Sequence, residues 1–327
     1  MKTWKIVILD GERTNPGDLG WDALRALGEL TVYPATAPEE LVSHIGDNEI
    51  VILDKPVISR EVLEACPSVK LITLFATGFN HIDIAAARAL GVTVSNAPGY
   101  SSWAVSQLAA ALLLEITTQV GQHSEAVRQG QWTDSSYFCR IAPGLTEIAG
   151  KTVGIIGYGG IGQAFGRIMK AMGAELLVYS RHVHPELEDA HTHYASLERL
   201  YTEADVISLH CPMNADSAGM INRESLSKMK DGTILINTSR GGLIVEEDVA
   251  EALRSGKLRA LGQDAFTVEP IRPDNPLLTA PHTFLTPHMG WAPRETRARL
   301  IELVAENVRS FQAGRPQNVV NGPLSKG

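Results

Sequence analysis

The chain has 327 residues, which is enough for about two domains with separate hydrophobic cores. With 44% apolar and 20% charged residues, its composition is that of a folded globular protein and excludes disordered and collagen-like classes. The net charge of -8 and the lack of a basic stripe exclude nucleic acid as the main partner, because phosphate backbones are bound by clustered lysine and arginine.

Short apolar segments alternate with helical patterns from the beginning of the chain. Several of these segments are apolar almost without alternation, as expected of parallel strands that are covered on both faces. The alternation predicts βαβ units around a first parallel sheet. The predicted strands of this sheet are residues 5–10, 30–34, 49–54, 70–78 and 92–98.

The longest apolar helix candidate begins at Ala104 with AVSQLAAALLLEITTQVG. Ser106, Gln107 and Glu115 interrupt it, so the pattern predicts a buried helix rather than a membrane span, and no membrane partner is expected. Ser102, just before this segment, is a candidate N-cap.

The start of the chain and its cysteines both predict a cytoplasmic protein. MKTWKIVILDG runs directly into a strand-like segment and leaves no room for a secretory signal peptide. Cys66, Cys139 and Cys211 are odd in number, far apart in the sequence and without a CxxC pair. Reduced thiols are therefore expected.

A second series of apolar segments predicts a second parallel sheet. A helix then starts at Pro293 and places Leu300, Val304, Val308 and Phe311 on one face. No further sheet follows this helix, so we expect the chain to return and pack on the first domain. The strands predicted for the second sheet are residues 151–157, 175–180, 205–212, 232–239, 259–266 and 283–288.

The glycine-rich loop GYGGIG, residues 157–162, joins a predicted strand to a predicted helix. In dinucleotide-binding units the first glycine permits a tight turn, the second lets the backbone approach the pyrophosphate, and the third allows close helix packing. A glycine-rich turn without a ligand is the alternative, but the context of strand, loop and helix favours a dinucleotide site. The candidate cofactor-binding residues here are Gly157, Gly159, Gly160, Ile161 and Gly162.

The acid that usually binds the adenosine ribose is missing. An NAD site carries Asp or Glu about 20 residues after the loop, whereas here the second strand ends in Ser180 and Arg181. Ser180 leaves room for a 2′-phosphate, and Arg181 can bind it through a charge-assisted, bidentate contact. These residues favour NADP(H); in the alternative, an NAD(H) enzyme, Arg181 is only a loop cation.

Four histidines follow in a segment predicted to be a loop: His182, His184, His191 and His193. They form two H-x-H pairs without a nearby cysteine or the spacing of a zinc motif. We therefore expect surface histidines and no metal site.

Arg240 and His288 each lie where a predicted strand ends, and Glu269 follows the end of another. In open α/β sheets ligands bind at that carboxyl edge. Each residue also has a purely structural explanation. Arg240 can be a helix-capping cation, Glu269 an exposed loop acid and His288 a buried imidazole. Their common position next to a dinucleotide site favours a catalytic set.

Seven segments spread over nearly the whole chain carry a family resemblance: FATGFNHID, VSNAPGYSSWAVSQLA, GIIGYGGIG, LHCPMNADSAGMIN, INTSRGGLIVEEDVAEAL, the segment from Asp264 to Glu269, and NPLLTAPHTFLTPHMG. With them the chain resembles the D-isomer-specific 2-hydroxyacid dehydrogenase family, and the opening LDGERTNPGDLGWDALRALGELTVYP is most similar to its glycerate dehydrogenase and hydroxypyruvate (glyoxylate) reductase branch. The resemblance implies two doubly wound parallel-sheet α/β domains. A flavodoxin-like substrate domain would comprise residues 1–100 and 293–327, and an inserted Rossmann NAD(P)-binding domain residues 101–292. It also implies a homodimer formed through the long helix and the segment after it.

The resemblance further implies roles for individual residues. The catalytic set would be Arg240, Glu269 and His288. Substrate would be bound by Thr77, Gly78, Arg240 and His288. The cofactor contacts beyond the glycine loop and Ser180-Arg181 would be Val105, Pro212, Thr238 and Asp264. Two positions depart from the family pattern, Ser180 in place of an acid and Ser106-Gln107 in place of Ala-Glu.

The implied reaction is the reversible, NAD(P)H-dependent reduction of a small 2-keto acid, hydroxypyruvate or glyoxylate, to the D-2-hydroxy acid. Arg240 can pair with the substrate carboxylate and keto oxygen, and His288 can donate the proton while Glu269 orients it. Tyr100 and Trp291 are candidates for pocket walls or for ordinary packing. Two alternatives stay open: a phosphite dehydrogenase-like oxidoreductase and a dinucleotide-sensing corepressor or interaction protein.

Overall fold

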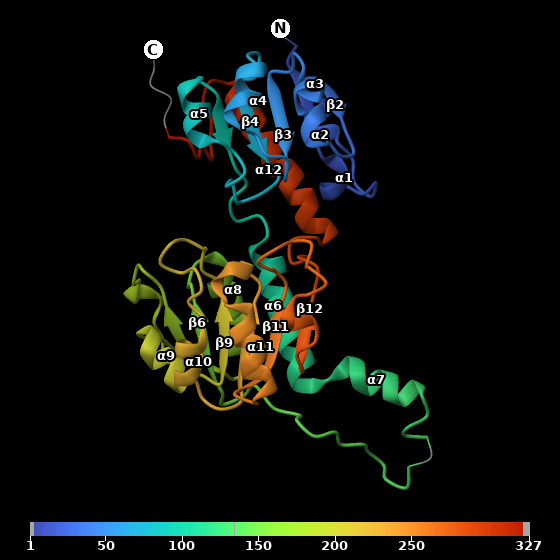
Figure 1. Ribbon diagram of the computed structural model, residues 1–327, viewed down its shortest axis with the longest axis vertical. Coiled ribbons are helices and arrows are strands. Elements are labelled where there is room, and N and C mark those ends of the chain that lie inside the picture. The colour runs from blue at the N-terminus through green and yellow to red at the C-terminus, as the bar shows by residue number, and fades with distance from the viewer. Residues whose placement is uncertain (1–2, 134, 323–327) are drawn as a thin grey trace. The chain divides into compact units, whose positions relative to one another are not determined.

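The computed structural model describes residues 3–133 and 135–322, and the chain divides into two compact units (Figure 1). The first unit joins Met1–Ser101 to Ala292–Gly327, and the second comprises Ser102–Trp291. Residues 1–2, 134 and 323–327, which the predicted domain boundaries include, lie outside the described residues.

The first unit contains a five-stranded, wholly parallel sheet in the order β2-β1-β3-β4-β5. This is the flavodoxin-like order, in which the topological switch point lies between β1 and β3. Strands β3 and β4 are buried at every position, since helices cover both faces of the sheet. The strands are β1 (Lys5–Ile8), β2 (Glu29–Val32), β3 (Ile50–Leu53), β4 (Leu71–Leu74) and β5 (Thr93–Ser95).

The last helix of the chain belongs to this unit and packs on β4. Its buried Leu300, Val304 and Val308 face the sheet, and the Asn307 amide donates a hydrogen bond to Thr73 Oγ1 at 3.2 Å. Pro293 precedes the first helical residue rather than forming it. The helices of the unit are α1 (Gly11–Thr14), α2 (Asp22–Arg25), α3 (Leu41–Ile45), α4 (Arg60–Ala65), α5 (Ile84–Ala89) and α12 (Arg294–Gln312).

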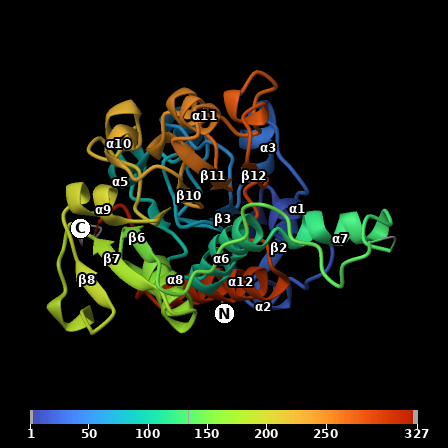
Figure 2. The same cartoon turned by 90° about the horizontal axis from the view of Figure 1, so that it is seen from below.

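The second unit contains a seven-stranded parallel sheet in the order β12-β11-β10-β9-β6-β7-β8. Counted from β6, this is the Rossmann order 3-2-1-4-5-6 with one further strand at the edge. Figures 1 and 2 show the helices of this unit arranged around the sheet. The strands are β6 (Thr152–Ile156), β7 (Glu175–Tyr179), β8 (Thr192–Tyr194), β9 (Val206–Leu209), β10 (Thr233–Asn237), β11 (Leu258–Gln263) and β12 (Thr283–Leu285).

The long helix α6 lies against β10, β11 and the helix that follows the glycine loop. Ala109, Leu113 and Ile116 are among its buried residues. Among the described helices no single one is long and apolar enough to cross a membrane; α6 and α7 pass that test only as a pair, bent by 55° at their junction. The helices of the unit are α6 (Ser102–Thr118), α7 (Val120–Arg128), α8 (Gly160–Ala171), α9 (Leu197–Glu203), α10 (Arg223–Lys228) and α11 (Glu246–Arg254).

The predicted fold class, two doubly wound parallel-sheet α/β domains, is confirmed, and only one strand escaped the sequence analysis. Strand β8 has three residues, Thr-His-Tyr, and pairs on one side only, with β7. The prediction of a loop was wrong here. An edge strand this short carries little apolar signal of its own and is stabilised by pairing with its neighbour.

Candidate active site

The glycine loop lies between the carboxyl end of β6 and the start of α8. Gly157 has φ of 101°, in the left-handed region that side chains disfavour. A Cβ atom there would lie 2.4 Å from the backbone nitrogen of Cys211. Both constraints explain why the tight turn requires glycine at this position.

The other two motif glycines have different surroundings. A Cβ on Gly162 would lie 2.2 Å from the carbonyl oxygen of Gly157, so glycine is needed for α8 to pack against the loop. Gly159 directly precedes α8, and a Cβ there would meet nothing within 4 Å. The open space at Gly159 therefore faces the N-terminal end of a 12-residue helix, where backbone N–H groups and the helix dipole favour phosphate.

The remaining loop residues complete this edge of the second unit. Ile161 is half-buried on the first turn of α8, and a Cβ on Gly160 would lie 3.3 Å from Ser102 Oγ. The Thr238 hydroxyl is buried and has no hydrogen-bond partner in the part of the chain that the structure describes. An unpaired buried hydroxyl at the end of β10 fits a ligand that supplies the missing bond.

Ser180 and Arg181 follow the carboxyl end of β7, the strand next to the glycine-loop strand. Ser180 is half-buried and Arg181 is exposed. Within residues 3–133 and 135–322 the Arg181 guanidinium has no hydrogen-bond or ion-pair partner, so its five donors are available. Pro212, after β9, is exposed, and its carbonyl accepts from Ser217 Oγ at 2.9 Å.

A histidine–carboxylate pair lies after strands β11 and β12. His288 Nδ1 is 2.7 Å from Glu269 Oε2, and the two side chains are 34% and 35% exposed. The other carboxylate oxygen, Glu269 Oε1, accepts from the Phe266 N–H at 2.9 Å. The backbone thus holds the carboxylate, and the carboxylate orients an imidazole that is still accessible.

Asp264 holds the segment that carries this imidazole. It is 2% exposed; its Oδ1 accepts from Thr286 Oγ1 at 2.6 Å and from the Met289 N–H at 2.9 Å, and its Oδ2 accepts from the Gly290 N–H at 2.9 Å. His288 between them has φ of 53°, a left-handed conformation of the kind that is maintained where surrounding contacts over-determine it. Val105 of α6 packs on this segment, with Cγ2 3.4 Å from a Cβ built on Gly290.

Arg240 is exposed and follows β10, which is the neighbour of β11 in the sheet. Asn237, fully buried at the end of β10, donates to the Arg240 carbonyl at 3.0 Å and accepts from the Ser239 N–H at 3.1 Å. A Cβ on Gly241 would lie 1.9 Å from the carbonyl carbon of Phe266. The loop of Arg240 therefore packs directly on the loop that carries Glu269.

Thr77 and Gly78 lie in the first unit, after the carboxyl end of β4. Thr77 Oγ1 donates to the Ala97 carbonyl at 2.8 Å, and the Asn96 amide donates to the Thr77 carbonyl at 2.8 Å. The backbone N–H groups of Thr77 and Gly78 have no hydrogen-bond partner among the described residues. Two adjacent free amides can bind an anion.

The sequence analysis missed several residues that position this site. Asn237 and Thr286 fix the segments of Arg240 and His288 as described above. Glu246, the first residue of α11, accepts from the Thr267 N–H at 3.1 Å and so braces the Glu269 loop. The signal for Asn237 was a polar residue ending an otherwise apolar strand; Thr286 and Glu246 gave none, since their partners lie 20 or more positions away.

The four histidines of the predicted loop are dispersed. His193 lies in β8, His191 Nδ1 is 2.9 Å from Glu175 Oε1, and His184 Nδ1 is 3.1 Å from Glu186 Oε1. Across the described part of the chain no three His, Cys, Asp or Glu side chains are placed to hold a metal ion. Of the two candidate pocket walls, Tyr100 is buried and Trp291 is half-buried.

Known proteins are similar to this chain both in sequence and in structure. Residues 110–290 match the family model for the D-isomer specific 2-hydroxyacid dehydrogenase, NAD binding domain. The chain is 46% identical over 320 residues to a hydroxypyruvate reductase of Blautia hydrogenotrophica, covering 97% of this chain and 99% of that protein.

Two solved structures are similar over nearly the whole chain. One is an acyclic imino acid reductase in complex with NADPH and D-Arg, with a TM-score of 0.83, 28% identity, and 96% of this chain and 99% of that chain covered. The other is D-lactate dehydrogenase from Aquifex aeolicus with NAD and lactic acid, with a TM-score of 0.83, 26% identity, and 97% and 99% covered. Nicotinamide dinucleotides thus bind proteins of this architecture in both the phosphorylated and the unphosphorylated form.

Proposed function

Because the chain belongs to the D-isomer-specific 2-hydroxyacid dehydrogenase family, we propose that it catalyses the reversible, NADP(H)-dependent reduction of hydroxypyruvate or glyoxylate to the D-2-hydroxy acid. The predicted class, a nicotinamide-dependent oxidoreductase of small 2-keto and 2-hydroxy acids, is confirmed by the family and by the relatives. The observation that carries the finer proposal is the Glu269–His288 pair beside the Arg240 loop.

The chemistry requires an anchor for the keto acid and a proton for the oxygen that becomes the alkoxide. When bound, the nicotinamide cofactor supplies the hydride. Arg240 is exposed and lies on a braced loop, so its guanidinium can pair with the substrate carboxylate and keto oxygen and stabilise the negative charge that grows on that oxygen. The free N–H groups of Thr77 and Gly78 are proposed to bind the carboxylate as well.

His288 is the proposed proton donor. Its Nδ1 is engaged by Glu269, which leaves Nε2 as the nitrogen that gives its proton to the substrate oxygen. The Glu269 carboxylate fixes the ring orientation and favours the imidazolium over the neutral ring. In the oxidation direction the neutral Nε2 takes the hydroxyl proton.

The cofactor assignment rests on contacts that a dinucleotide could make in the second unit. Gly157, Gly159, Gly160, Ile161 and Gly162 would hold the pyrophosphate. Ser180 and Arg181 would accept a 2′-phosphate, which supports NADP(H) over NAD(H). The remaining proposed contacts are Val105, Pro212, Thr238 and Asp264, of which Thr238 offers an unpaired buried hydroxyl.

We further propose that the first unit binds substrate and the second binds the cofactor, with boundaries at residues 1–100 plus 293–327 and 101–292, and that the enzyme is a cytoplasmic homodimer. The free cysteines among the described residues support the compartment. The dimer is supported by the helix α7 and the segment after it, where Tyr137, Phe138 and Ile141 are 76%, 92% and 79% exposed. Figure 2 shows α7 lying beyond the end of α6, away from the sheet of the second unit.

The test is steady-state oxidation of NADPH and NADH with hydroxypyruvate, glyoxylate and pyruvate, together with phosphite-dependent reduction of NADP+ and NAD+. We expect hydroxypyruvate or glyoxylate to give the highest kcat/KM, and NADPH to exceed NADH. Arg181→Ala should raise the KM for NADPH at least about tenfold and leave that for NADH nearly unchanged, since one charge-assisted contact is lost. An NADH preference in the unaltered enzyme would contradict the cofactor proposal, and turnover of phosphite alone would contradict the substrate.

A further inference from the structure

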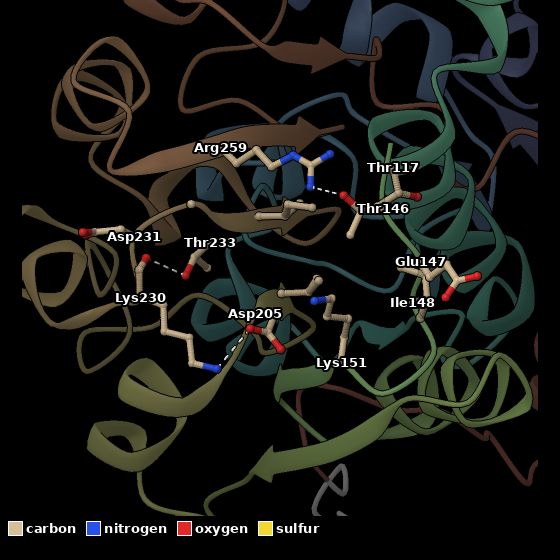
Figure 3. Close-up of a pocket in the computed structure, with 13 residues that line it drawn as sticks. Thr117, Thr146, Glu147, Ile148, Lys151, Asp205, Lys230, Asp231, Thr233 and Arg259 are labelled. Atoms are coloured by element: carbon tan, nitrogen blue, oxygen red, sulfur yellow. Dashed lines mark hydrogen bonds and ion pairs between the residues drawn. The ribbon is translucent and has the colours of Figure 1, made fainter. Parts of the chain in front are cut away.

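A cavity lies at the opposite edge of the seven-stranded sheet from the glycine loop. It has a volume of about 110 Å³ and is bordered by residues that immediately precede β6, β9 and β10 (Figure 3). Parallel strands direct all their amino ends to one edge, so this cavity and the candidate active site occupy opposite edges of the same sheet. Nothing in the proposed reaction uses it.

Three cationic side chains converge on this cavity. Lys151 precedes β6, Lys230 precedes β10, and Arg259 is the second residue of β11. Figure 3 shows the three side chains on different sides of the same space. The net charge of the chain is -8, yet three cationic side chains border this one concave site.

Three carboxylates, those of Glu147, Asp205 and Asp231, also border the cavity, but among the described residues only Asp205 is in direct contact with one of the three cations. Asp205 pairs with Lys230 at 3.0 Å through Oδ1, while its Oδ2 accepts from the Thr152 N–H at 2.9 Å. Asp231 pairs with Lys257 at 2.8 Å and is 89% exposed. Among the described residues, Lys230 is therefore the one cation of the three that has a carboxylate in direct contact.

Arg259 and Lys151 have no carboxylate in direct contact within the described residues. Arg259 donates to the Thr146 hydroxyl and to the Gly144 carbonyl, both of which are neutral. Burial lowers the pKa of Arg259, which reflects the cost of holding this cation away from water. Lys151 is half-buried, and in the described ranges its ammonium has neither a hydrogen-bond nor an ion-pair partner.

We infer that this cavity is a binding site for a small dianion, held by Lys151 and Arg259 with Lys230 at its side. The cavity of about 110 Å³ has room for a phosphate group or a short dicarboxylate. A dianion would give Lys151 and Arg259 the direct anionic partner that none of the three bordering carboxylates provides, and it would accept hydrogen bonds from their N–H groups.

The test is calorimetric titration of the full-length protein with inorganic phosphate at constant ionic strength. Saturating NADP+ is present throughout, so that the glycine loop and Arg181 are occupied and cannot bind the titrant. We expect saturable binding, weakened about tenfold or more by Lys151→Met and by Arg259→Met, since each removes a charge-assisted contact. Lys151→Met is the primary variant because it breaks no hydrogen bond among the described residues, whereas Arg259→Met also releases residues 144–146.

Two controls make the result specific. Lys228→Met removes the same charge from a lysine that pairs with Glu198 and Glu224 outside the cavity, and it should leave phosphate affinity unchanged. Arg240→Ala reports on phosphate that enters the proposed substrate site. The inference would be overturned if phosphate binding were abolished by Arg240→Ala and unchanged in Lys151→Met. It would also be overturned if the unaltered enzyme showed no saturable binding of phosphate up to roughly 50 mM.

A parallel titration with malonate identifies the kind of dianion. Tighter binding of phosphate assigns the site to a phosphoryl group, and tighter binding of malonate assigns it to a dicarboxylate. Loss of both affinities in Lys151→Met supports the shared site, whereas retention of both in that variant contradicts it. Because the readout is binding at the amino edge, the result does not depend on which keto acid the enzyme reduces.

Discussion

Each of the two sheets ends in a buried aspartate that clasps a neighbouring loop. Asp10, after β1, is 3% exposed and accepts from the N–H groups of Asp54 and Lys55, both at 2.9 Å. Asp264, after β11, is 2% exposed and accepts from the N–H groups of Met289 and Gly290, both at 2.9 Å. The two carboxylates perform the same structural task at the carboxyl edge of a parallel sheet.

The loops that they hold differ in chemistry. The loop held by Asp264 carries His288, whose imidazole is paired with Glu269 and remains accessible. The loop held by Asp10 carries a second buried acid, Asp54, and burial raises the pKa of both carboxyl groups. The clasp itself is therefore a means of fixing a loop, and the function depends on the side chain that the loop presents. Substitutions of the presented side chains and of the two aspartates test this distinction.

The largest expected effect is that of His288→Ala. Loss of the proposed proton donor should lower turnover by about two to four orders of magnitude, the usual range for general acid–base catalysis, while cofactor affinity is retained. The comparison variant is His81→Ala, which removes a half-buried histidine from the segment after β4 in the first unit and should reduce turnover far less. Stopped-flow and steady-state kinetics measure the difference, and near-normal turnover of His288→Ala would remove this residue from the mechanism.

A smaller effect is expected from weakening the two clasps. Asp264→Asn should lower turnover by about 10- to 100-fold, because the amide cannot accept from every donor around it and His288 shifts. Asp10→Asn should lower the free energy of unfolding by about 1–3 kcal/mol through the same loss, with little change in turnover. Urea denaturation measures the free energy of unfolding of both variants, and steady-state kinetics measures their turnover. Equal losses of turnover would show that both aspartates serve catalysis.

The smallest effect concerns acid stability. Burial, with a contribution from the charge of Lys55, lowers the pKa of His81 to about 4, below the value of about 6.5 in an unfolded chain. Between these values the unfolded chain binds more protons, so stability is lost as the pH falls through this window and is unaffected above it. Between pH 6.5 and 4, His81→Asn should therefore lose about 1–2 kcal/mol less of its free energy of unfolding than the unaltered protein, allowing for the partial exposure of the ring.

The control for this measurement is His193→Asn, which changes an exposed histidine and should leave the acid slope as it is. His210 contributes with the same sign in the second unit, since burial lowers its pKa to about 3. The difference between His81→Asn and the unaltered protein isolates the first unit, and identical slopes would show that the His81 ring is protonated without cost.

The strands and the glycine loop were predictable because their signals are local. Eleven of the twelve strands follow from short apolar runs, and Gly157 and Gly162 occupy positions where any Cβ would collide with backbone. The short polar strand β8 was not predictable, since its formation depends on its pairing with β7. The same limit applies to Thr286 and Glu246, whose hydrogen bonds join residues more than 20 positions apart.

Hydrophobic periodicity and motif spacing are properties of neighbouring residues, so they were enough to predict the class of fold, the glycine loop and the candidate trio Arg240, Glu269 and His288. Only the tertiary structure decided that Glu269 and His288 meet at 2.7 Å and that Asp264 holds the histidine segment. It alone brought Lys151, Lys230 and Arg259 around one cavity. Parallel strand order sets which loops become neighbours, and no local pattern encodes that order.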